Sequence, residues 1–133
     1  MSEDLLVTFP SGMPDQWPEI LSSRREGMTV VLTLFVPGST HWFRGHFDNQ
    51  PVLPGVAQVF WAEYFARALF TVPQGPFRIK SLKFSAMILP DAEPSLSIEH
   101  QAEKCQWVFR YSSGETVHSS GILAPIGRAS AAV

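Results

Sequence analysis

Several features that define other classes of protein are scarce in this sequence of 133 residues. A single cysteine, Cys105, excludes a disulfide within the chain and fits a reducing compartment. Basic residues are not in excess, with 10 Lys and Arg against 12 Asp and Glu, which argues against a nucleic-acid partner. The most apolar stretch, residues 56–70, is interrupted by Glu63 and Arg67, so no membrane span is expected. The acidic N-terminus lacks the apolar core of a secretory signal, so we expect a cytoplasmic protein.

The length suits one domain with its own hydrophobic core. We expect residues 1–133 to form that domain, with a lead-in over 1–27 and a flexible tail over 127–133. Within the lead-in, residues 14–21 are compatible with a short helix. Residues 22–27 are polar and end in glycine, which is typical of a loop.

The predicted centre of the fold is one long helix. Residues 28–36, dense in β-branched side chains, predict a buried strand before it. Pro54 and Gly55 stand where a helix starts, and nothing from 56 to 70 would break the helix. Only three strongly polar residues occur in that stretch, so the helix should be buried on most sides, with Phe60 and Phe65 inside.

Strands are predicted for the rest of the chain after a cluster of helix breakers at 71–76. One face of the strand predicted over 104–112 should carry Cys105 beside aromatic side chains, as part of the core. The predicted strands span residues 77–89, 95–103, 104–112 and 115–126. One strand, one helix and then four strands indicate an α+β protein.

A titratable group lies in the loop just before the predicted helix. The imidazole of His46, with an ordinary pKa of about 6.5, can take and return a proton near neutral pH. The free N–H groups and partial positive charge of a helix N-terminus can stabilise a developing oxyanion. A base and an oxyanion site would therefore fall within one short segment, although a lone loop histidine is more often structural or solvated.

The same segment resembles a known signature. Gly45-His46-Phe47 followed by Pro51-Val52-Leu53-Pro54-Gly55-Val56 resembles that of the β-hydroxyacyl-acyl-carrier-protein dehydratases, which have the hotdog fold. The longer string from Leu53 to Gln58, followed by Trp61, looks most like the dehydratase-like proteins of aryl polyene biosynthesis clusters. The resemblance implies a bent antiparallel sheet wrapped around one helix, and two protomers that join their sheets with active sites between them.

The resemblance also implies roles for particular residues. His46 would take the α-proton of a 3-hydroxyacyl thioester, and the Gly55 backbone N–H would stabilise the enolate oxygen. Phe47, Pro54 and Val56 would contact the substrate, as would Gln58 and Phe60. For Gln58, a helix cap or a buried polar contact is an equally good interpretation.

The chain departs from the family at the second catalytic position. Relatives have an Asp or Glu there that helps the β-hydroxyl leave and that works with the facing protomer's histidine; this chain has Phe60. Glu63 is the nearest substitute, but an ion pair with Arg67 at i,i+4 is the stronger interpretation. In addition, Asp48 stands where relatives usually have proline.

The remaining candidates carry less chemistry. His41 is expected in a loop, with a role at the pocket mouth as the alternative, and His100 and His118 are expected to be satisfied or exposed on strands. No His, Cys, Asp and Glu spacing suggests a metal site, and no cofactor is expected.

Three functions remain open from the sequence. The first is a hydro-lyase that dehydrates 3-hydroxyacyl chains on acyl-carrier protein, as a homodimer or as a heterodimer with a second dehydratase-like subunit. The second is a non-catalytic or half-catalytic acyl-binding subunit of such a heterodimer, because Phe60 replaces the acid. The third is a hotdog thioesterase, although its usual carboxylate is not evident.

Overall fold

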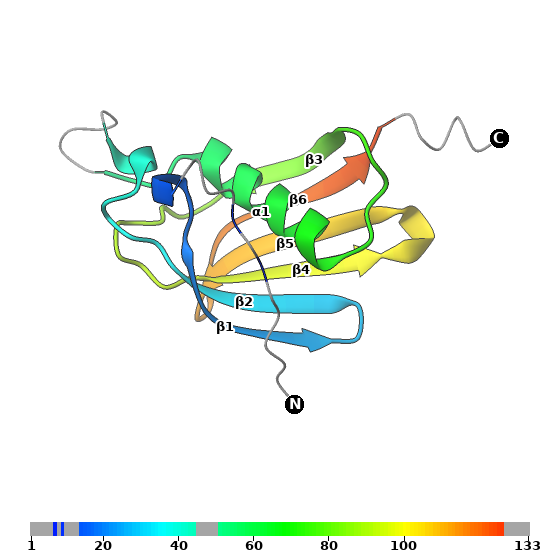
Figure 1. Ribbon diagram of the computed structural model, residues 1–133, viewed down its shortest axis with the longest axis horizontal. Helices are drawn as coiled ribbons and strands as arrows, with labels where there is room; N and C mark the ends of the chain where they lie inside the picture. Colours follow the sequence, from blue (N-terminus) through cyan, green and yellow to red (C-terminus); the bar gives the residue numbers. More distant parts are fainter. Residues whose placement is uncertain (1–6, 8, 10–13, 45–50, 127–133) are drawn as a thin grey trace.

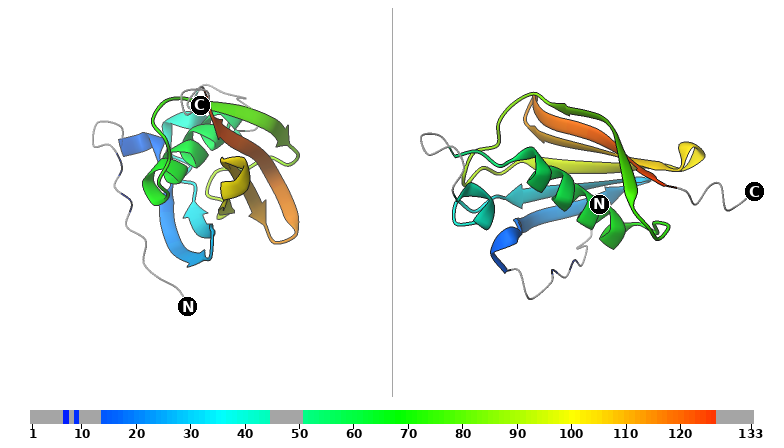
Figure 2. Two further views of the ribbon diagram at one scale, coloured as in Figure 1. Left: turned by 90° about the vertical axis from the view of Figure 1, so that its right-hand side faces the viewer. Right: turned by 90° about the horizontal axis from the view of Figure 1, so that it is seen from above.

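Six antiparallel strands and one long helix make up the computed structural model, which describes residues 7, 9, 14–44 and 51–126 (Figure 1). The tail expected at 127–133 lies outside the described residues. The strands form one sheet in the order β1-β2-β4-β5-β6-β3, so β1 and β3 are its edges. Their bounds are β1 Glu19–Glu26, β2 Thr29–Phe35, β3 Phe77–Phe84, β4 Ser95–Gln101, β5 Gln106–Ser113 and β6 Thr116–Pro125. The sheet curves around helix α1, Gly55–Leu69, which confirms the predicted α+β hotdog architecture (Figure 2).

Helix α1 begins and ends close to the predicted positions. Its first turn follows Pro54, and it stops where the Phe70 N–H bonds to the Ala66 carbonyl. The side chains that face the sheet recur at helical spacing, namely Ala57, Gln58, Trp61, Ala62, Phe65 and Ala66. The outer face is more open than expected, because Val56 is 66% exposed and Phe60 is only partly buried.

The N-terminal region differs from the prediction. Instead of a helix over 14–21 and a loop over 22–27, the chain forms a short 3-10 turn, η1 (Pro14–Gln16), and then strand β1. Strand β1 pairs with β2 along its whole length, through a turn at Gly27, whose φ is +61°. The strand is polar because it lies at an edge and buries little, so its sequence resembles a loop. Its backbone partners come from β2, which a local pattern cannot reveal.

Strand β5 also starts later than predicted. A 3-10 turn, η3 (Ala102–Lys104), joins β4 to β5, and Cys105 ends it in a left-handed conformation with φ of 51°. Cys105 is exposed, so the prediction that it packs in the core is wrong. The aromatic side chains after it do face inward, since Trp107, Phe109 and Tyr111 are fully or almost fully buried.

Strand β3 is shorter than predicted and is irregular in the middle. Its pairing with β6 shifts between Lys80 and Lys83, around Ser81 with φ of 53°. After Phe84 the chain leaves the sheet, and Ile88 then accepts a hydrogen bond from the Leu53 N–H at 2.8 Å. This bond ties the segment after β3 to the segment that leads into α1.

Candidate functional site

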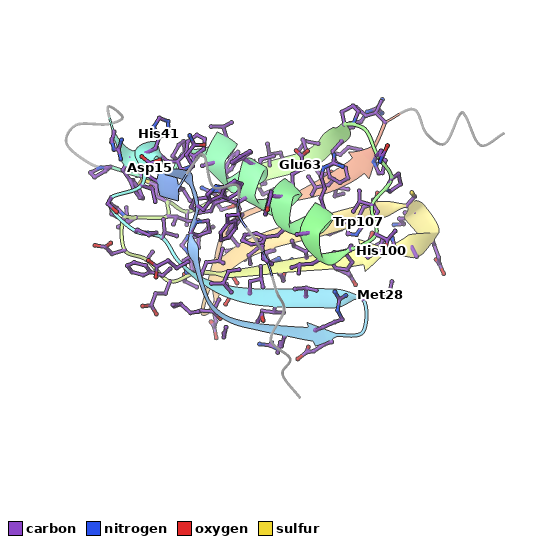
Figure 3. All side chains as sticks on the ribbon, in the orientation of Figure 1. Asp15, Met28, His41, Glu63, His100 and Trp107 are labelled. Carbon is purple, nitrogen blue, oxygen red and sulfur yellow. The ribbon has the colours of Figure 1, made fainter. Side chains whose placement is uncertain are left out.

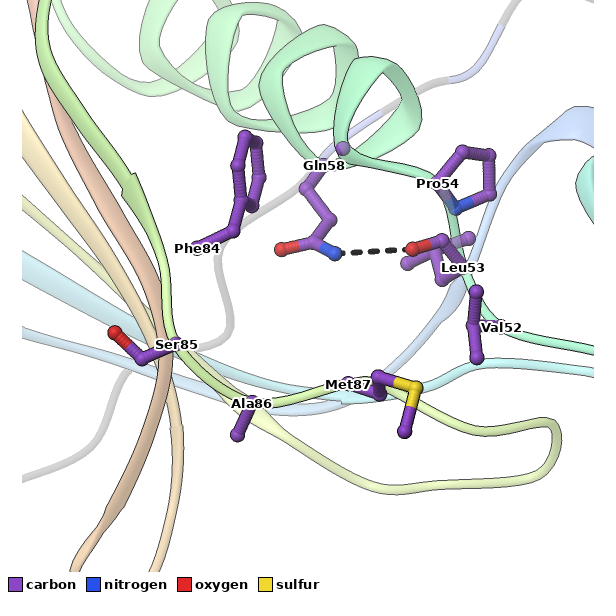
Figure 4. A pocket seen from close by; sticks show the side chains of 9 residues that line it. Val52, Leu53, Pro54, Gln58, Phe84, Ser85, Ala86 and Met87 are labelled. Atoms are coloured by element: carbon purple, nitrogen blue, oxygen red, sulfur yellow. Dashed lines mark hydrogen bonds between the residues drawn. The ribbon is translucent and has the colours of Figure 1, made fainter.

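A cavity of about 360 Å³ lies beside the N-terminus of α1. It is formed between the segment that enters the helix and the end of β3 with the chain that follows (Figure 4). Most of its wall is apolar, with the Gln58 amide as a polar group among the side chains. The lining residues are Val52, Leu53, Pro54, Gly55, Gln58, Phe84, Ser85, Ala86 and Met87.

The first turn of α1 offers backbone donors to this cavity. The Pro54 carbonyl accepts the N–H groups of Ala57 and Gln58 at 3.1 and 3.3 Å. The N–H of Gly55 precedes the two N–H groups that make these bonds. Like the other N–H groups of a first helical turn, it has no acceptor within the helix. Gly55 lines the cavity, so this turn can bind an anionic oxygen there.

The absence of a side chain at Gly55 leaves room for a close neighbour. A Cβ on Gly55 would lie 2.5 Å from Cζ of Phe84 and 2.9 Å from two further ring atoms. The Phe84 ring therefore lies directly against the start of the helix and forms one wall of the cavity. An apolar ring at this place limits the access of water to the first turn.

Gln58 is almost fully buried and connects three chain segments. Its Nε2 donates to the Leu53 carbonyl at 3.1 Å (Figure 4). Its Oε1 accepts from the Ser119 hydroxyl at 2.6 Å. The Tyr111 hydroxyl donates to the Gln58 backbone carbonyl at 2.7 Å. Burial raises the pKa of Tyr111 well above its usual value, so this hydroxyl stays protonated near neutral pH. The buried polar contact expected for Gln58 is present, and the side chain lines the cavity as well.

The structure brings together some of the sequence-predicted site residues. Pro54, Gly55 and Gln58 line the cavity, whereas Val56 and Phe60 do not. His46 and Phe47 fall within 45–50, outside the described residues, and so do Asp48 and the His46–Phe47 peptide bond.

Phe60, at the position of the family's acid, packs among aromatic rings. Its ring stacks on Trp17 with centroids 4.9 Å apart and an interplanar angle of 29°. Trp42 lies on another side, with its centroid 6.0 Å from that of Phe60. At this position α1 therefore makes a hydrophobic contact with the N-terminal region.

Glu63 makes the ion pair expected for it. Its Oε2 lies 3.2 Å from Arg67, one helical turn later. Arg67 also donates to the Gly75 carbonyl at 2.6 Å and lies over the Phe77 ring. Glu63 is not among the residues that line the cavity, and Figure 3 places it midway along the helix.

None of the described histidines is among the residues that line the cavity. His41 is exposed in the 3-10 turn η2 (His41–Phe43), and His100 stacks on Trp107 with centroids 4.3 Å apart, towards the other end of the molecule (Figure 3). His118 is buried and pairs its Nε2 with the Ser113 hydroxyl at 2.7 Å.

Several lining residues were not anticipated from the sequence. Phe84 ends β3, and Ser85, Ala86 and Met87 follow it. The Gln58 partner Ser119, which was not anticipated either, lies on β6, far from the helix in sequence. The sequence signal for Ser119 was weak, because it consists only of a polar residue at an inward-facing position of a strand.

Within the described ranges, no three His, Cys, Asp or Glu side chains are placed to hold a metal ion. None of the described helices has the length and apolar character needed to cross a bilayer.

Comparisons with known proteins identify relatives of this chain. Residues 22–122 match the family described as ApeI-like, ApeI dehydratase. A chain of the solved dehydratase heterocomplex ApeI:P from Xenorhabdus doucetiae is 30% identical, with a TM-score of 0.74 over 81% of this chain and 96% of that one. An uncharacterized protein from Erwinia carotovora subsp. atroseptica is 33% identical, with a TM-score of 0.64 over 83% and 98% of the two chains. Curated protein sequences contain no match. The family match covers most of the chain, and the protein therefore belongs to the ApeI-like dehydratase family.

Proposed function

We propose that this chain is a subunit of a dehydratase that acts on 3-hydroxyacyl chains carried by acyl-carrier protein. The observation that carries the proposal is the start of α1, where Gly55 lines a mainly apolar cavity at a helix N-terminus. A thioester oxygen bound there would gain negative charge as the α-proton leaves, and the Gly55 N–H would stabilise it.

His46 is the base in this proposal. It takes the proton from Cα, the electron pair forms the enolate, and the pair then returns to make the Cα=Cβ double bond. The β-hydroxyl leaves with a proton as water, and the product is a 2-enoyl thioester. The departing hydroxyl needs an acid, and general acid help is worth about 10²–10⁴ in rate.

The missing acid supports a heterodimer, with this chain half-catalytic. Phe60 packs against Trp17 and Trp42, and Glu63 is paired with Arg67. The carboxylate would then come from the helix of a second dehydratase-like subunit. The relative from Xenorhabdus doucetiae is a chain of a dehydratase heterocomplex.

Strand β3 is the edge at which we propose that this partner joins. It ends the sheet, and it is exposed over most of its length. Large apolar side chains lie exposed on or beside it, including Leu82, Phe84, Met87 and Val56. Such an edge next to the cavity suits a partner that extends the sheet and closes the site.

A thioesterase is the weaker alternative. Such an enzyme would use a carboxylate, and none of the described residues that line the cavity carries one.

The test is dehydration of 3-hydroxyacyl-acyl-carrier protein by the isolated chain and by its complex with a second dehydratase-like subunit. We expect the isolated chain to be slow and the complex to be active, with activity lost in His46→Ala. Strong activity of the isolated chain that is lost in Glu63→Gln would instead make Glu63 the acid. If the complex is inactive with acyl chains of every length, only the acyl-binding role remains for this protein.

A further inference from the structure

The buried amide of Gln58 is unusual for the inner face of an otherwise apolar helix. Its neighbours on that face are Ala57, Trp61 and Ala62. Burying an amide costs free energy unless both its ends are hydrogen-bonded. Both ends are bonded here, to Leu53 and to Ser119. The amide is therefore held in one orientation by partners from two other parts of the chain.

These bonds fix the segment that carries the Gly55 N–H. The Leu53 residue is held on both sides, by Gln58 at its carbonyl and by Ile88 at its N–H. The next residue is Pro54, whose ring restricts its own φ, here -66°. The Pro54 carbonyl, in the same peptide unit as the Gly55 N–H, accepts the N–H of Gln58 itself. Gln58 thus contacts the peptide units on both sides of Pro54.

We infer that Gln58 is a positioning residue, which orients the Gly55 N–H toward the cavity by clamping the Leu53–Gly55 segment to the sheet through Ser119. The inference rests on the proposed role of that N–H in binding the thioester oxygen. An oxyanion donor acts through its fixed position, because no reorganisation is then needed as charge develops. A misplacement of about 1 Å can cost about 100-fold in rate.

A direct contact with the substrate is the competing role for Gln58, because the side chain also lines the cavity. The two roles predict different kinetics. Loss of a substrate contact raises KM, whereas a misplaced oxyanion donor lowers kcat with little change in KM.

The experiment compares Gln58→Leu and Gln58→Glu in the complex with the partner subunit. Gln74→Glu is the matched control, because Gln74 is an exposed glutamine in the loop after α1. The first readout is kcat and KM across pH. The second is the amide spectrum of ¹⁵N-glycine-labelled chain, which has only nine glycines, with Gly55 assigned through Gly55→Ala.

We expect Gln58→Leu to move the Gly55 amide peak and to lower kcat about 100-fold while KM changes little. In Gln58→Glu the protonated acid can still donate to the Leu53 carbonyl, but the carboxylate cannot. Its kcat should therefore fall as pH rises, through a titration that the wild type lacks. Ser119→Ala keeps the hydrogen bond from Gln58 to the Leu53 carbonyl, so it should shift the Gly55 peak less. It replaces the Gln58 variants as the test if these do not fold.

A Gly55 peak that stays in place in every folded variant would overturn the inference, as would a rise in KM at constant kcat. Complete inactivity of the wild-type complex would refute the proposed function instead. The glycine spectra would still decide whether Gln58 orients Gly55.

Discussion

At the scale of single residues, two glycines meet aromatic rings at similarly short distances but in different surroundings. A Cβ on Gly55 would lie 2.5 Å from the Phe84 ring, and one on Gly121 would lie 2.7 Å from the Phe109 ring. The Phe84 side chain is about half exposed and its ring can turn away, whereas Phe109 is fully buried. The same added methyl group therefore has different consequences at the two positions.

Gly121→Ala should lower the free energy of unfolding by about 1–3 kcal/mol, because Phe109 has no space to move into. Gly55→Ala should cost less than about 1 kcal/mol, since the Phe84 ring swings out and alanine favours the helix. Urea denaturation of the two variants measures both values. Equal losses would mean that the Phe84 ring is held as firmly as the Phe109 ring.

At the scale of the elements, an aromatic cluster attaches the N-terminal region to α1. The cluster consists of Phe9, Trp17, Trp42, Phe60 and Tyr64, and Trp17 is its centre, in contact with three of the other rings. The Trp42 and Trp61 indoles both donate to the Gln16 carbonyl, at 2.9 and 2.8 Å, and so fix η1 beside the helix. Phe60 belongs to this attachment, which gives it a structural role.

Trp17→Ala should lower the free energy of unfolding by about 3–5 kcal/mol, the usual cost of removing a large buried aromatic ring. Leu21→Ala, at an exposed position of β1, should stay within about 0.5 kcal/mol of the wild type. Chemical denaturation followed by tryptophan fluorescence and circular dichroism reports both. A small effect of Trp17→Ala would show that the N-terminal region contributes little to the stability of α1.

At the scale of the whole molecule, the sheet has two different edges. Strand β1 alternates mostly between exposed and partly buried residues, whereas β3 is exposed along most of its length and lies beside the cavity. Each edge has one exposed leucine, Leu21 on β1 and Leu82 on β3. These leucines offer a matched comparison of the two edges.

Leu82→Lys should weaken binding to the partner subunit by more than about tenfold, because the interface would have to bury an unpaired charge. Leu21→Lys should leave the affinity unchanged. Sedimentation velocity at several concentrations of the partner measures both dissociation constants, and thermal unfolding checks that each variant is folded. The reverse result would place the interface on β1.

The sequence alone determined the features that depend on neighbouring residues. The helix starts at Pro54 and Gly55 because their local preferences suit a first turn, and it ends near the breakers that follow Phe70. The alternation that turns Phe109 and Tyr111 inward is likewise local. The motif from Gly45 to Val56 indicated the family, which the family match confirms, and Phe60 stands where that resemblance implies an acid.

Only the tertiary structure decided the features that depend on residues far apart in the chain. Strand β1 exists because β2 supplies its hydrogen bonds, although its own residues resemble a loop. Phe84 reaches Gly55, and Ser119 reaches Gln58, only after the sheet has curved around the helix. A polar residue on an apolar helix is ambiguous by itself. Its role depends on which distant groups are close enough to bond to it, and folding alone brings those groups together.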